Sequence, residues 1–548
     1  MREAGEPTIN KDSVPANKDS TQVNKYSVSA NKDSTQINKD SASANKDITL
    51  VNKYSVPNNE DSKLVNKYNA PIYNYLREYA KQDINVFHMP GHKLAKGMPQ
   101  DLVQDVLQLD VTEVEGTDNL HYPEGIIKRA EELAAKAFGA DKTFFLVNGS
   151  TCGIQAAIMS VCARGQKIII GRDSHKSVVS GLILSGAEPV FVYPEYNCEF
   201  GITGAISAKS IEQSLCENPD AVAVLITRPN YYGMCSDIEE ISSIVHSHNK
   251  LLIVDEAHGA HLTFNRQLPP SALEHGADIC IQSAHKTLPA VTQGAYLHIK
   301  GNRVDFDRLK FNLTMLQTSS PSYIIMSYLD IARELMVTSG AERLDDLIKD
   351  LEWFKQGMND YGTYKVLSNQ YLSEKTVHDP TRLVINVSKL GISGYCAEKI
   401  LRDEFKTQVE MADYENLVFI TTIADNREVF SRLLEAMKGL ADNIALKWDK
   451  KLGKVMTLRE YTDCQSKSFS EASISPYNAY ISQKDEVSFE ESSGRICADI
   501  ITPYPPGIPI LYPGEKIDQY QIQYIAAIIQ AGGMVNGIGY NKYIKVIK

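Results

Sequence analysis

The stretch Ile281-Gln282-Ser283-Ala284-His285-Lys286-Thr287-Leu288-Pro289-Ala290 begins with an apolar run that leads into a polar turn with a lysine. Upstream, residues 251–258 read Leu-Leu-Ile-Val-Asp-Glu-Ala-His, which is a second apolar run, and it ends in acidic and histidine side chains. Short apolar runs bounded by polar turns are typical of buried strands. In α/β sheets, ligands bind at the carboxyl ends of strands. We therefore predict that Lys286 and Asp255 lie at one ligand-binding edge of a sheet.

Apolar runs and helical patterns alternate through much of the chain around these two stretches. The predicted strands are residues 143–147, 167–170, 189–192, 221–227, 251–254, 279–282 and 293–299, and the predicted helices include 126–138, 154–162, 208–216 and 238–248. Runs this apolar, separated by helices, are typical of a largely parallel sheet that is covered on both faces. The sequence therefore predicts an α/β fold with a mostly parallel central sheet.

Four parts follow from the changes in composition along the chain. In residues 1–70, Asn-Lys recurs every seven residues from Asn10 to Asn66, with Asn59-Glu60 in place of one copy. This period could indicate a coiled coil, but Asn, Ser, Asp and Pro favour a disordered segment. We predict a major domain at 71–365, a smaller α/β domain at 366–450 and a C-terminal domain at 451–548.

Composition excludes several classes of function. The net charge of −11 argues against nucleic acid as the main partner, since phosphate backbones require a basic face. The nine cysteines are scattered without a metal-ligand spacing, which fits reduced thiols and predicts no metal site. No apolar run is long enough to span a membrane. We therefore expect a soluble, cytoplasmic protein that binds neither nucleic acid nor membrane.

A phosphate site is predicted where one strand leads into a helix. Residues Asn148, Gly149, Ser150 and Thr151 follow the strand at 143–147, and the predicted helix begins near Ile154. Backbone N–H groups at a helix N-terminus, together with two hydroxyl groups, form a good anion site. Taken alone, the motif is more typical of an ordinary Ser/Thr helix cap than of a phosphate site. Other residues near this segment have to distinguish a phosphate site from a helix cap.

Together these residues indicate pyridoxal 5′-phosphate (PLP). This cofactor requires a lysine that forms an imine, a carboxylate for the ring nitrogen, a planar side chain against the ring, and an anion site for the phosphate. Lys286, Asp255, His175 and the segment 148–151 with Ser283 supply these groups in turn. Any one of them alone is better explained as a surface lysine or a helix cap. Their joint occurrence at strand ends favours a PLP site.

From about Tyr73 onward, the chain resembles the prokaryotic ornithine/lysine/arginine decarboxylases, whose fold is that of the aspartate aminotransferases (fold type I). The matching motifs are His88-Met89-Pro90-Gly91-His92-Lys93, Asp118-Asn119-Leu120-His121 with Pro123-Glu124-Gly125, Phe144 to Thr151, His175-Lys176-Ser177, Asp255 to His261, Ser283 to Leu288, Ser320 to Tyr323 and the loop Pro505–Pro509. The N-terminal wing of the larger members is absent, so the chain resembles the short form.

The resemblance implies a role for each site residue. Lys286 would form the Schiff base, Asp255 would contact the pyridine nitrogen, His175 would stack on the ring, and His258 would lie near the ring hydroxyl. Ser150, Thr151, Ser283 and His285 would surround the phosphate. Either His285 or Lys286 would return the proton. Candidates for contacts with the substrate are Asp118, His121, Glu124 and Glu515.

The resemblance also implies a homodimer or higher homo-oligomer with active sites at the subunit interface, where the loop Thr318–Ser322 would reach the neighbour's phosphate. The expected activity is decarboxylation of a basic amino acid, arginine or lysine rather than ornithine, that feeds polyamine metabolism. An aminotransferase or a carbon–sulfur lyase is an alternative, because Arg382 could bind an α-carboxylate. A non-catalytic paralogue is a further alternative, which the intact Lys286, Asp255 and His175 argue against.

Overall fold

The computed structural model describes residues 71–104, 106–447, 473–505, 507–539 and 542–548. The chain divides between Ala70 and Pro71, and the predictions for residues 1–70 lie outside the described residues. The domain boundaries at 365 and 450 stay predictions. Within the described ranges, no helix has both the length and the apolar character needed to cross a membrane.

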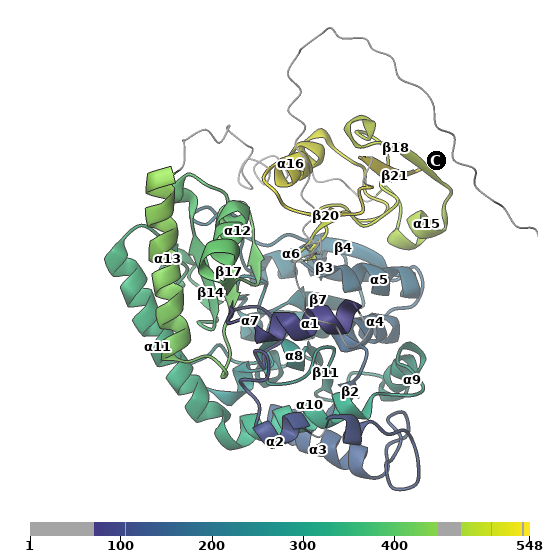
Figure 1. Cartoon of the computed structure of the whole chain (residues 1–548). Helices are drawn as coiled ribbons and strands as arrows, with labels where there is room; N and C mark the ends of the chain where they lie inside the picture. The colour runs from purple at the N-terminus through teal and green to yellow at the C-terminus, as the bar shows by residue number, and fades with distance from the viewer. Residues whose placement is uncertain (1–70, 105, 448–472, 506, 540–541) are drawn as a thin grey trace, which may run out of the picture. The chain divides into compact units, whose positions relative to one another are not determined.

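A seven-stranded sheet forms the centre of the structure, in the order β2-β11-β10-β9-β7-β3-β4 (Figure 1). Its strands are β2 (Lys142–Leu146), β3 (Lys167–Gly171), β4 (Glu188–Val192), β7 (Ala223–Thr227), β9 (Leu251–Asp255), β10 (Ile279–Gln282) and β11 (Ala295–Ile299). Strands β10, β9, β7, β3 and β4 are mutually parallel, whereas β11 runs antiparallel to both of its neighbours. The predicted α/β fold with a mostly parallel sheet is confirmed.

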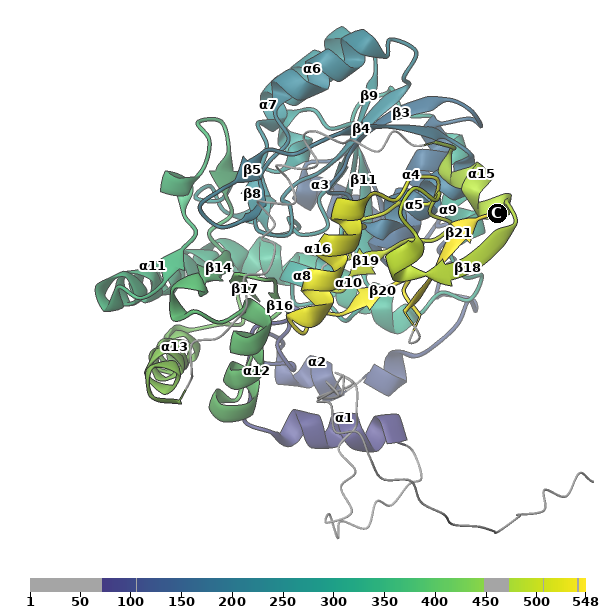
Figure 2. The same cartoon turned by 90° about the horizontal axis from the view of Figure 1, so that it is seen from above.

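Helices cover both faces of this sheet (Figure 2). They are α3 (Ile126–Phe138), α4 (Gly149–Val161), α5 (Lys176–Ser185), α6 (Ala208–Glu217), α7 (Ile238–Ser247), α8 (Ala284–Thr287) and α9 (Phe306–Leu316). Successive strand residues point to opposite faces. Accordingly, Ile253 packs in one core cluster with residues of α4, α5 and α9, while Leu252 and Val254 pack in the other with residues of α3, α6 and α7. Because both faces are buried, the strands are apolar along their whole length.

Helix α4 begins earlier than the sequence predicted. It starts at Gly149 rather than near Ile154, so that Ser150 and Thr151 lie in its first turn. The predicted start was wrong because a glycine such as Gly153, just before Ile154, is typical of a turn. A Cβ at Gly153 would lie 2.7 Å from a side-chain atom of Leu146. The glycine is therefore a packing residue that lets α4 approach the sheet closely.

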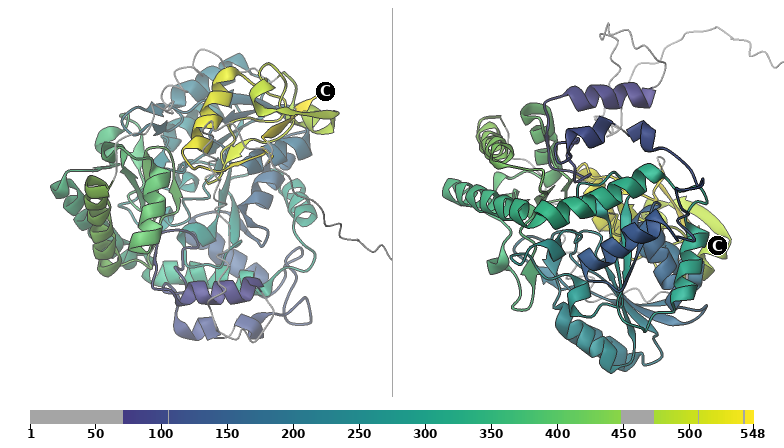
Figure 3. Two further views of the ribbon diagram at one scale, coloured as in Figure 1. Left: turned by 45° about the horizontal axis from the view of Figure 1, so that its top comes forward. Right: turned by 90° about the horizontal axis from the view of Figure 1, so that it is seen from below.

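A second, smaller sheet lies after a long helical segment (Figure 3). The segment consists of α10 (Tyr323–Leu335), a π-helical turn (Met336–Gly340) and α11 (Ala341–Tyr361). The sheet has the order β12-β14-β17-β16. Its strands are β12 (Lys365–Val366), β14 (Arg382–Asn386), β16 (Met411–Ala412) and β17 (Asn416–Ile420), and the helices beside it are α12 (Gly394–Phe405) and α13 (Arg427–Lys447).

The C-terminal part has its own apolar cluster. Its elements are α15 (Pro476–Ile481), β18 (Lys484–Ser488), β19 (Thr502–Pro503), α16 (Gln519–Gln530), β20 (Val535–Asn536) and β21 (Tyr543–Ile547). The remaining short elements are α1 (Pro71–Lys81), β1 (Asn85–Val86), α2 (Gln100–Gln104), β5 (Tyr196–Asn197), β6 (Ile202–Thr203), β8 (Met234–Cys235), β13 (Val377–His378) and β15 (Thr407–Gln408). Strand β1 pairs with β15 in a separate two-stranded sheet. The N–H of Ile420 in β17 donates to the carbonyl oxygen of Phe87, which ties the start of the described chain to the smaller sheet.

Candidate active site

The fold brings Lys286 and Asp255 to the same edge of the central sheet. Asp255 is the last residue of β9, and Lys286 lies in α8 directly after the adjacent parallel strand β10. Asp255 is buried, and its Oδ1 accepts a hydrogen bond of 3.2 Å from the N–H of Ala257. Burial lowers the pKa of Lys286, and the charge of Asp255 opposes this shift. The two groups therefore form an oppositely charged pair in a site that excludes much of the solvent.

His258 and Arg382 extend this part of the site. His258 Nε2 lies 3.1 Å from Lys286 Nζ, and Arg382 Nη2 lies 2.8 Å from His258 Nδ1. The ring of Tyr231 packs edge-on against His258, with 4.8 Å between the ring centroids. Arg382 is buried, and its Nε and Nη1 have no partner among the residues that the structure describes. These two donors are available to an anionic ligand.

His175 lies at the N-terminus of α5, next to the C-terminal part of the chain. Its Nδ1 accepts from the N–H of Ser177 at 3.2 Å, which leaves the proton of the neutral ring on Nε2. Burial lowers the pKa of His175 to about 3. A Cβ on Gly507 would lie 3.2 Å from Cδ2 and Nε2 of the ring, and the N–H of Lys176 donates to the carbonyl oxygen of Gly507. The backbone at Gly507 therefore packs directly against His175.

The predicted phosphate site is the uncapped N-terminus of α4. Helices α6, α7 and α9 each begin with a Ser or Asp side chain that accepts from a backbone N–H, whereas the side chain of Asn148 accepts none. Ser283 Oγ lies 2.9 Å from Ser150 Oγ, and Thr151 is exposed. His285 Nδ1 donates to the carbonyl oxygen of Gly294 at 3.0 Å, and burial lowers the pKa of His285 to about 4.

These features fit PLP. An uncapped helix N-terminus with two adjacent hydroxyl groups suits a phosphate. The buried carboxylate of Asp255 suits a ring nitrogen that carries a proton. Lys286 supplies an amine whose pKa is lowered by burial, which is the property required of an imine-forming lysine. The residues Lys286, Asp255, His175, His258, Asn148, Gly149, Ser150, Thr151, Ser283 and His285 were all predicted from the sequence, and the structure puts them at the ends of β2, β3, β9 and β10.

Asp118, His121 and Glu124, three of the predicted substrate contacts, lie around the start of α3. The carboxylate of Asp118 accepts from the backbone N–H groups of Glu124, Gly125 and Ile127, so it caps this helix. His121 Nε2 contacts the carbonyl oxygen of Thr318 at 2.9 Å, and Glu124 is exposed. These contacts give Asp118 a structural task and connect its loop to the segment at Thr318.

The fourth predicted substrate contact, Glu515, forms a buried ion pair with Arg172. Its Oε2 lies 3.0 Å from Arg172 Nη2 and accepts from the N–H of Tyr512. Arg172 also donates to the carbonyl oxygens of Pro509 and Ile510. Glu515 therefore joins the C-terminal part to the segment that carries His175, and none of these contacts involves Lys286.

Glu410, which the sequence reasoning missed, adds a negative charge to the site. Its Oε1 accepts from the hydroxyl of Tyr231, and its Oε2 accepts from the N–H of Met89 at 3.0 Å. Its charge raises the pKa values of Lys286 and His285, against the effect of burial. Glu410 follows β15 in a segment without a recognisable motif, and only the packing of the smaller sheet brings it to Lys286.

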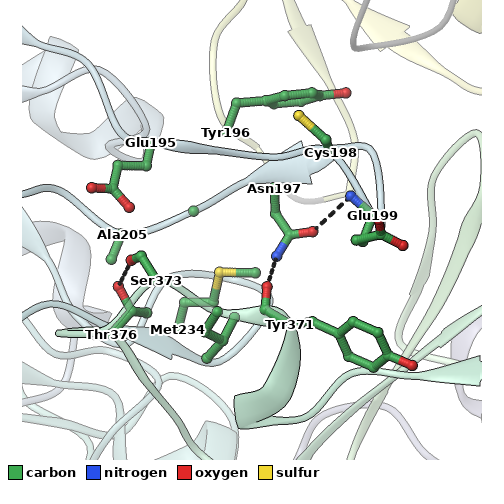
Figure 4. A pocket seen from close by; sticks show the side chains of 12 residues that line it. Glu195, Tyr196, Asn197, Cys198, Glu199, Ala205, Met234, Tyr371, Ser373 and Thr376 are labelled. Carbon is green, nitrogen blue, oxygen red and sulfur yellow. Dashed lines mark hydrogen bonds between the residues drawn. The ribbon is translucent and has the colours of Figure 1, made fainter.

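A separate pocket of about 250 Å³ lies between the β5–β6 hairpin and the segment 371–376 (Figure 4). Its lining residues are Glu195, Tyr196, Asn197, Cys198, Glu199, Gly204, Ala205, Met234, Tyr371, Leu372, Ser373 and Thr376. None of them belongs to the predicted PLP site. The pocket is therefore distinct from the site at Lys286.

Comparison with solved structures agrees with the fold. The constitutive lysine decarboxylase of Escherichia coli superposes with a TM-score of 0.69 at 20% identity, covering 87% of this chain and 82% of that protein. The serine palmitoyltransferase of Sphingomonas wittichii superposes with a TM-score of 0.51 at 17% identity, covering 64% of this chain and 86% of that protein. At these identities the likeness concerns the fold alone.

Sequence comparison identifies the family. Residues 70–429 match the major domain of the Orn/Lys/Arg decarboxylases, and residues 459–541 match their C-terminal domain. An arginine decarboxylase of Bacillus subtilis is 36% identical over 85% of this chain and 95% of its own length. These matches favour a decarboxylase over an aminotransferase, a carbon–sulfur lyase or a non-catalytic paralogue. The chain therefore belongs to the Orn/Lys/Arg decarboxylase family and is a PLP-dependent decarboxylase of a basic amino acid.

Proposed function

We propose that this enzyme decarboxylates arginine in preference to lysine, with ornithine least favoured, and that the amine product feeds polyamine metabolism. Its similarity to an arginine decarboxylase supports arginine. The observation that supports a basic substrate is the carboxylate of Glu410, which two hydrogen bonds hold in place and whose charge acts on Lys286. A fixed carboxylate suits a cationic side chain, which arginine, lysine and ornithine share, so the preference for arginine rests on the similarity to the arginine decarboxylase.

The proposed roles of the remaining residues follow from their contacts. Lys286 would hold PLP covalently, and Asp255, at the end of β9, would contact the ring nitrogen. His175, which packs against Gly507, would stack on the ring, and the N-terminus of α4 would bind the phosphate with Ser283. When bound, PLP supplies an electron sink that accepts the electron pair left as the carboxylate departs.

We assign the return of the proton to Lys286 rather than His285. The one N–H of neutral His285 is on Nδ1, where it donates to the carbonyl oxygen of Gly294. Since the pKa of His285 is about 4, the ring carries no second proton at neutral pH. Lys286 Nζ can carry a proton and lies on the same side of the site as His258. The task of His285 is then to position the turn that carries Lys286.

Product analysis tests the proposed function. The purified full chain is incubated with PLP and, separately, with arginine, lysine or ornithine, and the released CO₂ and amine are measured. We expect the highest kcat/KM with arginine, and release of agmatine in equal amount to CO₂. Highest kcat/KM with lysine or ornithine would refute the arginine preference. An oxo-acid product would show that the enzyme catalyses transamination, and it would refute decarboxylation.

We further propose that the enzyme is a homodimer or a higher homo-oligomer. Among the described residues, more than half of the exposed large apolar side chains come from α1, from residues 103–126 and from α9, including Ile72 (78% exposed), Leu107 (83%) and Phe311 (64%). Exposed apolar surface of this kind marks a protein interface. The segment Thr318–Ser320 is also exposed beside His121, in position to contact a second copy.

Subunit mixing tests this arrangement. A Lys286→Ala chain and a chain with Thr318, Ser319 and Ser320 changed to alanine are each expected to be nearly inactive. If the loop of one subunit completes the site of the other, mixed dimers restore part of the activity. Sedimentation of the unmodified enzyme as a monomer, or mixtures without restored activity, would contradict the shared site.

A further inference from the structure

Two short segments meet beside Lys286 through two parallel pairs of side chains. His258 and His261 lie three residues apart after β9, and Asp379 and Arg382 lie three residues apart at the start of β14. Arg382 Nη2 contacts His258 Nδ1 at 2.8 Å, and Asp379 Oδ2 contacts His261 Nε2 at 3.0 Å. All four residues are buried. Because the spacing is equal on the two segments, His258 faces the cation Arg382 and His261 faces the anion Asp379.

The contact with Arg382 determines which nitrogen of His258 carries the proton. A guanidinium group has only donors, so His258 Nδ1 must be the acceptor and carries no hydrogen. The proton of the neutral ring is then on Nε2, which lies 3.1 Å from Lys286 Nζ. An ammonium group cannot accept a hydrogen bond, whereas an uncharged amine can. The chain of contacts is therefore complete only if Lys286 is uncharged.

The surroundings of both groups agree with this assignment. Burial is the main cause that lowers the pKa of His258 and of Lys286, so the uncharged forms are favoured. The edge-on ring of Tyr231 limits rotation of His258. The titratable and charged groups that act on His258 and Lys286 are Asp255, Glu410, Arg382, His175 and His285. Of these, Asp255 and Glu410 favour the ammonium form, and burial outweighs them.

We propose that Arg382 is a positioning residue that, through His258, fixes the Nε2–H tautomer and presents the amine of Lys286 as an uncharged nucleophile for PLP. This inference rests on the proposed function, in which Lys286 anchors the cofactor. An ammonium has no lone pair, whereas the uncharged amine can attack the aldehyde carbon of PLP. A C=N bond forms, and the aldehyde oxygen leaves as water with the two protons that the amine loses.

Capture of PLP by the cofactor-free protein tests the inference without a measurement of decarboxylation. PLP is added at several pH values, and the rate at which the imine absorbance rises is measured. The proteins compared are the unmodified chain and the variants Arg382→Met, Arg382→Lys and His258→Phe. We expect the midpoint of the rate against pH to move up by about one unit in Arg382→Met and His258→Phe, as the pKa of Lys286 rises, so that the rate below that midpoint falls by about tenfold. Arg382→Lys keeps a donor and the charge, and it should capture PLP nearly as fast as the unmodified chain.

Asp379→Asn is the matched control, because it weakens the neighbouring pair in the same two segments and leaves the contact with His258 intact. We expect unchanged capture by this variant. An equal loss in Asp379→Asn would show that general disruption of the segments slows capture, and would overturn the inference. Unchanged capture by His258→Phe would also overturn it, since the charge of Arg382 alone would then suffice.

Nitrogen-15 NMR of histidine-labelled, cofactor-free protein gives a readout that is independent of PLP. The signals of His258 are identified by their loss in His258→Phe. We expect the Nε2–H tautomer in the unmodified chain and a mixture of tautomers in Arg382→Met. The Nδ1–H tautomer in the unmodified chain would overturn the inference. Imine formation by Lys286→Ala would instead refute the anchor itself, and with it the proposed function.

Discussion

The lysine end and the phosphate end of the site are built differently. At the lysine end, Asp255 and His258 are buried, and Lys286, His258 and Arg382 contact one another within one chain. At the phosphate end, the first turn of α4 has no side-chain cap, and Thr151 is exposed.

This difference follows from what each end has to do. The lysine end must hold charges and protons in a fixed arrangement, which requires exclusion of water and partners supplied by the protein. The proposed phosphate end would have to remain open to an incoming dianion, which agrees with the absence of a side-chain cap at the start of α4. Substitutions at the lysine end should therefore affect chemistry, whereas those at the phosphate end should affect cofactor affinity.

Replacement of the anchor should have the largest effect. Lys286→Ala removes the covalent link and the proposed proton carrier, so we expect kcat to fall by about 10⁴-fold or more. Initial rates of CO₂ release measure this change. Glu195→Gln, in the separate pocket, is the control and should keep normal kcat. A fall in kcat of less than about tenfold in Lys286→Ala would contradict the expectation that substitutions at the lysine end affect the chemistry.

Glu410→Gln should come next, since it removes the charge but keeps the size of the side chain. A hydrogen bond to a charged partner contributes about 1.5–3 kcal/mol, so kcat/KM for arginine should fall about 10- to 100-fold. Steady-state kinetics with arginine measures this, and most of the loss should appear in KM. Equal losses for a substrate that lacks a distal cation would show that Glu410 acts on the lysine end and not on the substrate.

Thr151→Ala should have a smaller effect, which is confined to cofactor affinity. Loss of one hydrogen bond to a charged group should weaken PLP binding by about tenfold. Titration of the cofactor-free protein with PLP measures the Kd, and Ser180→Ala, at a hydroxyl of α5 outside the site, serves as the control. Because Thr151 is exposed, its loss should leave the unfolding temperature of the cofactor-free protein unchanged. A lower unfolding temperature would mean that the phosphate end is already a structural part of the apoprotein.

Acid should destabilise the cofactor-free protein, in part through the histidines His175 and His285. The pKa values of His175 and His285 are about 3 and about 4 in the folded protein and near 6.5 in the unfolded chain. Between about pH 6.5 and 4 the unfolded chain therefore binds more protons, and the free energy of unfolding falls as the pH falls. Each histidine contributes at most about 1.4 kcal/mol per pH unit.

Urea unfolding at pH 7 and pH 5 measures this dependence. His285→Gln, which cannot titrate, should reduce the difference between the two pH values, whereas Ser150→Ala at the phosphate end should leave it unchanged. An equal difference in the unmodified chain and in His285→Gln would show that His285 takes no part in the linkage.

Local sequence predicted the main elements well where a strand ends in a functional group. Apolar runs before Asp255 and before Ser283 are visible in the sequence, and the carboxyl ends of parallel strands must meet at one edge. The extent of α4 was harder to predict, because Gly153 looks like a turn residue until the close approach of Leu146 is known. Local patterns cannot distinguish a glycine that turns the chain from one that packs against it.

Local patterns and the family resemblance therefore predict the α/β fold, the family and the cofactor, and they identify Lys286, Asp255, His175 and the segment 148–151 as candidate site residues. The other groups that reach these residues depend on tertiary packing. Arg382 comes from β14 of the smaller sheet, Glu410 from the segment between β15 and β16, and Gly507 from the C-terminal part. Such contacts join residues far apart in the chain, and no local periodicity or spacing encodes them. They exist because separately folded surfaces pack together around the end of the central sheet.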